Sequence, residues 1–364
     1  MKKYRLLIFI NKIKYSGASK IAVWLANQFA GESFDVTFVT YSEADTSGMF
    51  DENVKYICLD CQEKNKIKRY GLVVKRLRNL LKKTDIDLAL GFLPVECMQL
   101  IMASAGLKIR TIVAERSDPY LEKSLMARLG RFSYRFADGA VFQTEGAKNY
   151  FCRRISKKSK VIPNPAFIAE TEFIPYYDRP EKISHSARLY IRQKRQDILL
   201  KAFSIVARKN DDVILHIYGD GPDEYILKTQ AEELGIENRV VFEGKVSDVE
   251  DRIKDSRVFV LSSDYEGIPN ALIEALAAGV PGVSTECSPG GARVLIKDGV
   301  NGFVTERGDA DALADKILYI LSAPDKGVEM AKKAREVVDE FAPKKIYGLW
   351  KKYLVSVIER AGKK

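Results

Sequence analysis

The stretch RVFVLSSDYEGIPNALIEALAAGVP, residues 257–281, predicts a strand, a sharp turn and a helix. Its first part is an apolar run typical of a buried parallel strand, and Pro269 has the fixed φ and missing N–H donor that suit the first position of a helix. In a parallel sheet such a turn lies at the carboxyl end of its strand, where ligands of open α/β sheets bind. The free N–H groups of Ile268 to Ala271 and the helix dipole would then form an anion site suited to phosphate.

Two carboxylates stand on either side of this turn. Glu266 precedes the helix and Glu274 lies about a turn inside it. Since both could flank an anion at the helix amides without both touching it, we expect a ligand that carries hydroxyl groups as well as phosphate.

The same alternation of short apolar runs and helix-length segments extends in both directions from this stretch. It predicts an α/β fold with two doubly wound, Rossmann-like domains that face each other across a cleft. The expected strands of the first domain are 4–10, 35–41, 87–93, 110–116 and 138–144, and those of the second are 183–189, 212–220, 239–245, 257–263 and 280–285. Prolines and acids at 161–182 disfavour regular structure there. The predicted domains are 1–165 and 183–343, with a linker at 166–182 and a final helix at 344–364.

Composition excludes several classes of protein. With 364 residues, of which 46% are hydrophobic, the chain can fill two cores. It has no run of eighteen apolar residues and no secretory signal, which predicts a cytosolic protein. Five scattered cysteines include only one closely spaced pair, Cys58 and Cys61, so we expect structural thiols and no metal site.

The net charge of +10 is unevenly distributed. Residues 1–165 hold 29 Lys and Arg against 16 Asp and Glu, a net charge of +13, whereas the rest of the chain has a net charge of −3. Such asymmetry indicates an anionic partner for the first domain, either a nucleic acid or an anionic membrane face. Two basic amphipathic segments, 64–83 and 122–136, lie in this domain. They lack a recognised nucleic-acid module, so we predict a membrane or pyrophosphate contact at Lys75, Arg76 and Arg78, and no nucleic-acid partner.

Five further motifs accompany the Glu-x7-Glu pair of residues 266 and 274 in a fixed order. They are ARLYIRQKRQDILLKAF (187–203), YGDGPDE (218–224), VVFEGKVSD (240–248), AAGVP (277–281) and DGVNGFV (298–304). In this order and context the second domain resembles that of the retaining glycosyltransferases of family 4, which have the two-domain GT-B fold and use nucleotide-sugar donors. Capsular, exopolysaccharide and lipid-linked glycan transferases of bacteria are the members it resembles.

The resemblance implies a role for each matching position. Arg188 and Lys194 would bind the donor diphosphate and replace a metal ion, Glu266 would hold the donor sugar near the reacting carbon, and Glu274 would accept hydrogen bonds from the ribose. We accordingly expect Glu266, Arg188 and Lys194 to be the catalytic residues. The remaining donor-binding residues implied by the resemblance are Gly17, Gly219, Val246, Gly267, Ile268, Pro269 and Asn270.

The first domain matches the family less closely. The family's Gly-Gly-Ala-Glu loop is replaced by Ser16-Gly17-Ala18-Ser19, and Arg116 stands where a histidine is common. The segment AERSDP (114–119) resembles a version found in capsular and exopolysaccharide enzymes, so Arg116 and Asp118 are expected in the cleft. Of the two histidines, His216 is expected to be a core residue of an apolar strand.

These features predict a retaining, metal-independent glycosyltransferase that moves a hexosyl or N-acetylhexosaminyl group from a UDP- or GDP-sugar. Its acceptor would be a glycan intermediate linked to polyprenyl pyrophosphate at the cytoplasmic face of the membrane. Two alternatives remain open: a catalytically silent nucleotide-sugar-binding partner of another transferase, and a nucleotide-sugar epimerase on the same fold. A dinucleotide-dependent dehydrogenase is disfavoured, because GDGPDE lacks the third glycine of that fingerprint.

The final segment predicts a helix that crosses back onto the first domain, as the resemblance implies. An apolar set spaced three to four residues apart would dock it: Ile346, Leu349, Trp350, Tyr353, Leu354 and Ile358.

Overall fold

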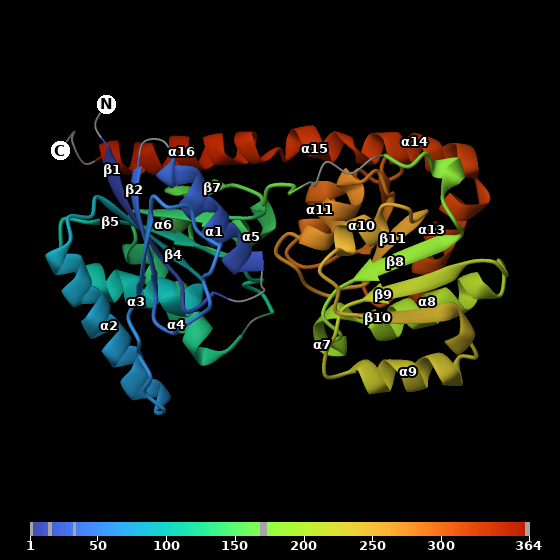
Figure 1. Cartoon of the computed structure of the whole chain (residues 1–364), viewed down its shortest axis with the longest axis horizontal. Coiled ribbons are helices and arrows are strands. Elements are labelled where there is room, and N and C mark those ends of the chain that lie inside the picture. The colour runs from blue at the N-terminus through green and yellow to red at the C-terminus, as the bar shows by residue number, and fades with distance from the viewer. Residues whose placement is uncertain (1–2, 14–16, 32–33, 122, 168–172, 361–364) are drawn as a thin grey trace. The chain divides into compact units, whose positions relative to one another are not determined.

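The chain folds into two compact units, each built on one parallel sheet. The computed structural model describes residues 3–13, 17–31, 34–121, 123–167 and 173–360. Unit 1 comprises Met1–Pro163 together with Lys344–Lys364, and unit 2 comprises Asn164–Pro343 (Figure 1). The predicted α/β class, with two parallel sheets, is confirmed.

Unit 1 contains a seven-stranded sheet in the order β3-β2-β1-β4-β5-β6-β7. Its strands are β1 (Tyr4–Phe9), β2 (Phe34–Thr40), β3 (Val54–Cys58), β4 (Leu88–Phe92), β5 (Arg110–Ala114), β6 (Gly139–Phe142) and β7 (Ser159–Val161). Its helices are α1 (Gly17–Ala30), α2 (Lys66–Lys83), α3 (Pro94–Ser104), α4 (Leu125–Ser133), α5 (Glu145–Asn149), α6 (Arg153–Ser156) and α16 (Pro343–Glu359), with a 3₁₀ turn η1 (Tyr134–Phe136). Figure 1 shows α2, α3 and α4 on one side of this sheet.

Unit 2 contains a six-stranded sheet in the order β10-β9-β8-β11-β12-β13. Its strands are β8 (Lys182–Ser186), β9 (Ile214–Tyr218), β10 (Val240–Gly244), β11 (Val258–Leu261), β12 (Gly282–Thr285) and β13 (Gly302–Thr305). Its longer helices are α8 (Gln196–Ala207), α9 (Glu224–Glu233), α11 (Asn270–Ala277), α13 (Ala310–Ser322) and α14 (Pro324–Ala334). Shorter elements are α7 (Ile191–Lys194), α10 (Val249–Ile253), α12 (Gly291–Leu295), α15 (Glu336–Glu340) and the 3₁₀ turns η2 (Tyr176–Asp178) and η3 (Glu237–Arg239).

Every strand predicted from the apolar runs is present, but β3, β7 and β13 are additional. Buried parallel strands carry continuous apolar runs, and β4 and β11 have every residue buried. In β3 only Val54 is buried, because this strand is the edge of its sheet and pairs with β2 alone. Its sequence therefore lacks the apolar run by which the other strands were predicted.

The segment 166–182, expected as a linker, contributes side chains to the interior of unit 2. Ala166 is buried and its N–H donates to the carbonyl of Phe341 at 2.9 Å. Tyr176 lies in the same core cluster as the β8 and β9 side chains. Arg179 is buried as well, and its guanidinium donates to the carbonyls of Ser256 and Gly279, each at 3.0 Å.

Helix α16 follows unit 2 in the chain but packs on unit 1. Trp350 and Leu354 are fully buried, and the Tyr353 hydroxyl donates to the carbonyl of Ala140 at 3.1 Å and accepts from the N–H of Ala140 at 2.9 Å. Of the predicted apolar set, Leu349 is wrong, because its side chain is 39% exposed. The helix buries Tyr347 and Val357 in addition.

None of the helices among the described residues has the length and apolar character needed to cross a membrane.

Candidate active site

The residues expected to bind the donor diphosphate lie at the switch point of the unit 2 sheet. The chain starts in the centre at β8, proceeds outward to β9 and β10, and returns to place β11 on the other side of β8. Ligands of doubly wound sheets bind where the strand order reverses in this way, at the carboxyl ends of the strands. Arg188 and Lys194 follow β8, and Glu266 follows β11, so the two neighbouring strands at the switch point carry all three.

Lys194 and Glu266 form an ion pair, with 2.5 Å between Nζ and Oε1. Their side chains are only 18% and 12% exposed. The hydroxyl of Ser263 donates to the same carboxylate oxygen at 2.8 Å, and the hydroxyl of Ser262 donates to the carbonyl of Lys194 at 2.8 Å. The two serines that follow β11 therefore fix both partners. An ammonium with three N–H donors can keep this carboxylate and still bind a further anion.

Arg188 presents its guanidinium differently. It is exposed, and its Cζ lies 6.0 Å from the centroid of the Tyr190 ring. Its carbonyl accepts a hydrogen bond from Nε2 of the buried Gln196 at 3.0 Å. The backbone at this position is thus anchored while the charged group is free to reach a ligand.

Arg195, the residue after Lys194, is ion-paired. It adopts a left-handed backbone with φ of 52° between α7 and α8. Its guanidinium pairs with Asp197 at 3.0 Å and with Asp264 at 3.2 Å, so it ties the loop after β8 to the loop after β11. Arg192, by contrast, is exposed.

The turn after β11 leads directly into α11. Pro269 is the N-cap residue and Asn270 the first helical residue, one position later than predicted. No described side chain accepts a hydrogen bond from the first amides of α11, which therefore remain available to an anion. The side chain of Asn270 is bound within unit 2, because its Oδ1 accepts from Nδ2 of Asn164 at 2.7 Å.

The loop that follows β12 packs against this turn. The N–H of Glu266 donates to the carbonyl of Ser288 at 2.8 Å. A Cβ on Gly291 would lie 2.3 Å from the carbonyl oxygen of Gly267, so only glycine permits this contact. Ile268 is buried in the core cluster beside α11, while Gly267 and Glu274 are half-buried.

Gly219, an expected donor-binding residue, and Gly221 each make a close backbone contact. Gly219 has φ of +131°, and a Cβ there would lie 2.0 Å from the carbonyl oxygen of Ala187. A Cβ on Gly221 would lie 2.1 Å from the carbonyl oxygen of Leu189. Both glycines let the loop after β9 lie against the loop that carries Arg188. Val246, in the loop after β10, is half-buried against the core beside α11.

A buried histidine adjoins the site, and sequence reasoning assigned it no role. His185, in β8, is fully buried, and its Nδ1 lies 2.9 Å from the carbonyl oxygen of Val260. Since a carbonyl can only accept, Nδ1 carries the hydrogen, and Nε2 faces Nε2 of Gln196 at 3.5 Å. Burial lowers the pKa of His185 from 6.5 to about 4. The imidazole is therefore neutral near neutral pH.

The other histidine is not the core residue that was predicted. His216 in β9 is partly exposed, and its Nδ1 lies 2.7 Å from Oε1 of Glu243. Residue 216 is flanked in sequence by buried Leu215 and Ile217, and successive strand residues face opposite sides of the sheet. The apolar residues around His216 therefore gave no indication that its side chain is half-exposed.

The remaining predicted site residues belong to unit 1. Gly17 is exposed at the start of α1, and Ser16 lies outside the described residues. Arg116 follows β5, with its Cζ 5.7 Å from the Phe92 ring centroid and 5.3 Å from that of Trp350. Burial lowers the pKa of Arg116 to about 9, so the group remains a cation near neutral pH. Asp118 is buried, and its Oδ1 accepts from the N–H of Tyr120 at 2.8 Å.

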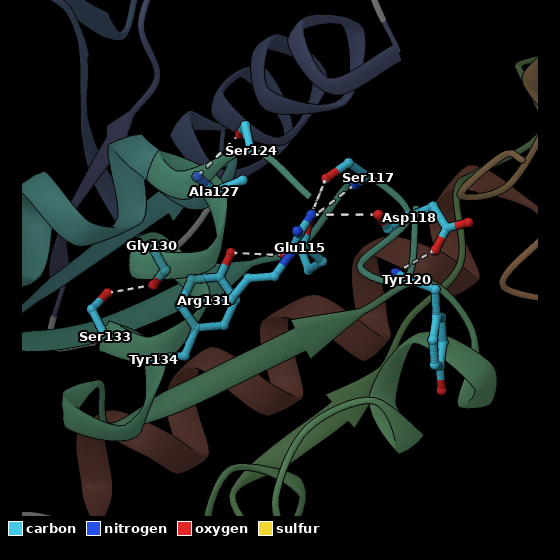
Figure 2. A network of polar contacts seen from close by, with 10 residues as sticks. All are labelled: Glu115, Ser117, Asp118, Tyr120, Ser124, Ala127, Gly130, Arg131, Ser133 and Tyr134. Atoms are coloured by element: carbon cyan, nitrogen blue, oxygen red, sulfur yellow. Dashed lines mark hydrogen bonds and ion pairs between the residues drawn. The ribbon is translucent and has the colours of Figure 1, made fainter. Parts of the chain in front are cut away.

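A buried ion pair supports this loop, as Figure 2 shows. Arg131 of α4 donates from Nε to Glu115 at 3.0 Å and from Nη2 to the Ser117 hydroxyl at 3.0 Å. Tyr134 donates to the same carboxylate at 3.1 Å. The loop that carries Arg116 and Asp118 is consequently held by α4, a connection that sequence reasoning missed.

The three basic residues predicted as a membrane or pyrophosphate contact differ in their surroundings. Lys75 is exposed on α2. Nη1 of Arg76 donates to the carbonyls of Leu59 and Asp60, each at 2.5 Å, and Nη1 of Arg78 donates to those of Ala103 and Ala105 at 2.9 and 2.7 Å. Both arginines thus fasten α2 to neighbouring backbone.

Comparison with known proteins shows what this chain resembles. Residues 170–337 match the family model described as "Glycosyl transferases group 1". An uncharacterized glycosyltransferase of Haemophilus influenzae is 27% identical over 338 residues, which cover 92% of this chain and 95% of the relative. A Campylobacter jejuni alpha-1,4-N-acetyl-D-galactosaminyltransferase, whose named substrate is a glycan on undecaprenyl diphosphate (PP-undecaprenol), is 27% identical over 362 residues, which cover 97% and 99% of the two chains.

Solved structures agree with the fold. The lipopolysaccharide outer core galactosyltransferase WaaB superposes with a TM-score of 0.80 at 22% identity over 97% of this chain and 99% of its own. Anabaena HepE in complex with UDP and glucose superposes with a TM-score of 0.81 at 20% identity over 97% of this chain and all of its own.

Two parallel α/β units, with cations and a carboxylate at the switch point of the second, are arranged in the GT-B fold that these solved structures share. Most of unit 2 is thus similar to the glycosyltransferases of group 1, and the two relatives that match nearly the whole chain are themselves named glycosyltransferases.

Proposed function

We propose that this protein is a retaining, metal-independent glycosyltransferase that moves a hexosyl or N-acetylhexosaminyl group from a UDP- or GDP-sugar to a lipid-linked glycan. The observation that carries the proposal is the ion pair of Lys194 with Glu266 at the switch point, with Arg188 on the loop after β8 and the uncapped amides of α11 following Glu266 in the chain. Such a cluster offers positive charge to a diphosphate and a carboxylate to sugar hydroxyls at adjacent positions.

The chemistry follows from where charge develops. As the glycosidic bond to the donor phosphate breaks, negative charge grows on the diphosphate, and Arg188, Lys194 and the α11 amides stabilise it. Glu266, held by Ser263, accepts hydrogen bonds from the donor sugar and orients its reacting carbon. The acceptor hydroxyl enters on the face from which the diphosphate leaves, and the leaving phosphate takes its proton, which retains the anomeric configuration. Glu274 binds the ribose.

The printed names of relatives support the choice of substrates. HepE binds UDP, and the Campylobacter jejuni enzyme acts on a polyprenyl-diphosphate-linked glycan. The basic surface of unit 1 is complementary to such an acceptor and to an anionic membrane face, which would place the protein peripherally at the cytoplasmic side of the membrane in cell-surface polysaccharide synthesis, for example of a capsule. In this proposal Arg116 and Asp118 contact the acceptor, and Gly17 approaches the donor.

A panel of UDP- and GDP-sugars, with mass-spectrometric detection of hydrolysis and of transfer to a polyprenyl-diphosphate glycan, tests the proposal. We expect one donor to be consumed, with the α-configured sugar retained in the product and activity unchanged by EDTA. Binding of a nucleotide sugar without turnover would favour the silent-partner alternative. Conversion of the sugar to its epimer would favour the epimerase, and loss of transfer in EDTA would contradict metal independence.

A further inference from the structure

The outward side of α4 is apolar, which is the reverse of the usual pattern for a surface helix. Leu125 is 70% exposed, Leu129 is 46% exposed, Phe132 is 54% exposed and, in the following 3₁₀ turn, Phe136 is 64% exposed. These positions are spaced three to four residues apart and therefore form one stripe. We refer to Leu125, Leu129, Phe132 and Phe136 as the α4 stripe.

Positive charge borders the α4 stripe. Residues 123–136 contain four basic side chains and no acidic one. Lys123 and Arg128 are exposed, and the Cζ of Arg135 lies 3.5 Å from the centroid of the Phe132 ring. The inward side of the helix holds the fourth, Arg131, within the buried network of Figure 2. The helix thus presents leucine and phenylalanine to the outside, and the described charged side chains of residues 123–136 are all cations.

We propose that the α4 stripe is the surface by which unit 1 docks on an anionic lipid bilayer, with its apolar side chains inserted at the level of the headgroups. Leucine and phenylalanine gain from leaving water at this depth, and the bordering cations gain from lipid phosphates, at about 1 kcal/mol for each basic side chain near the surface. The inference rests on the proposed function, because a lipid-linked acceptor requires the enzyme to work at a membrane.

The inner side of the same helix connects this surface to the predicted acceptor loop. Arg131 bonds Glu115 and Ser117, and the Cβ that any other residue would add at Gly130 would lie 2.3 Å from the carbonyl oxygen of Pro94. A docked α4 would therefore hold the loop of Arg116 and Asp118 at a fixed height above the lipid phosphates. That height suits an acceptor whose diphosphate lies at the membrane surface.

Vesicle flotation tests this surface. The full chain is mixed with vesicles of phosphatidylglycerol and phosphatidylcholine, or of phosphatidylcholine alone, and compared with a variant that carries Leu125→Ser, Leu129→Ser and Phe132→Ser. The control carries Tyr225→Ser and Ile226→Ser on α9 of unit 2, where the side chains are 81% and 55% exposed. We expect at least tenfold weaker binding of the α4 variant to the anionic vesicles, unchanged binding of the control, and weak binding of all three to phosphatidylcholine.

A second measurement separates insertion from adsorption. Phe132→Trp and Tyr225→Trp chains are compared for quenching of tryptophan fluorescence by brominated lipids, and we expect additional quenching only for Phe132→Trp. Equal quenching, or unchanged flotation of the serine variant, would overturn the inference. A dimer that light scattering detects and the serine substitutions dissociate would also overturn it, in favour of a second copy. Donor hydrolysis by the serine variant in solution tests the transferase function separately and should equal that of the wild type.

Discussion

The exposed guanidinium of Arg188 allows the charge-stabilisation step to be tested without disturbing the fold. We expect Arg188→Ala to lower kcat for sugar transfer by about 100-fold, because loss of one donor to a developing anion typically costs this much. Arg192→Ala is the matched control, since Arg192 is also exposed and lies four residues away. Equal kinetics of the Arg188→Ala and Arg192→Ala enzymes would remove Arg188 from the site.

Glu274→Ala should instead chiefly raise KM for the donor, because a ribose contact is the same before and during bond breaking.

The neutral His185 makes the stability of unit 2 depend on pH. Its pKa is about 4 in the folded chain and 6.5 in the unfolded chain, so the unfolded state binds the proton more readily between these values. Stability is therefore complete above pH 6.5 and falls as the pH decreases toward 4, by about 2 kcal/mol between pH 7 and pH 5. In a His185→Asn chain this part of the pH dependence should disappear.

Hydrogen exchange at β8, corrected for the intrinsic effect of pH on exchange, measures this difference. Identical pH profiles for the wild-type and His185→Asn chains would show that the imidazole is not protonated on unfolding in this range.

At the scale of elements, the contact between the loops after β8 and β9 depends on glycine. We expect Gly219→Ala to displace the loop of Arg188, because the new Cβ would lie 2.0 Å from the carbonyl oxygen of Ala187. Gly235→Ala is the control, since Gly235 also has a positive φ, of 66°, but has nothing within 4 Å of its Cβ position. The control should lose about 1–2 kcal/mol of stability from backbone strain alone. Gly219→Ala should lose more stability than the control. It should also bind the donor more weakly, which calorimetry with the nucleoside diphosphate measures.

The elements also show what the sequence could predict. Strands β1, β4, β5 and β11 could be predicted because each is a run of apolar residues. The turn before α11 could be predicted from the backbone preferences of proline and glycine. The edge strand β3 and the half-exposed His216 were not predictable in this way, because their exposure depends on which strand lies beside them. The ion pair of Lys194 with Glu266 joins residues 72 positions apart, and only the assembled sheet brings them together.

At the scale of the whole molecule, α16 joins distant parts of the chain into one unit. The Tyr353 hydroxyl bonds Ala140 and, at 2.5 Å, the carbonyl of Lys158. We expect Tyr353→Phe to destabilise unit 1 by about 1–3 kcal/mol, because it leaves buried backbone groups without this partner. Leu349→Ala, at an exposed position of the same helix, should change stability by less than about 0.5 kcal/mol.

Urea unfolding followed by tryptophan fluorescence reports this difference, because both tryptophans, Trp24 and Trp350, belong to unit 1. A Tyr353→Phe chain that unfolds at the wild-type urea concentration would mean that water replaces the hydroxyl at no cost.

The route of the chain also sets an order of events during its synthesis. Domains usually fold in the order in which the ribosome releases them. Here residues 164–343 are complete before Trp350, Tyr353 and Leu354 have been made, and these three are buried parts of unit 1. Chains arrested on the ribosome shortly after unit 2 has emerged should therefore resist protease in unit 2 while unit 1 is still cut. Unit 1 is translated first but completed last. Until α16 has been made, the surface of unit 1 against which Trp350, Tyr353 and Leu354 pack is exposed to solvent.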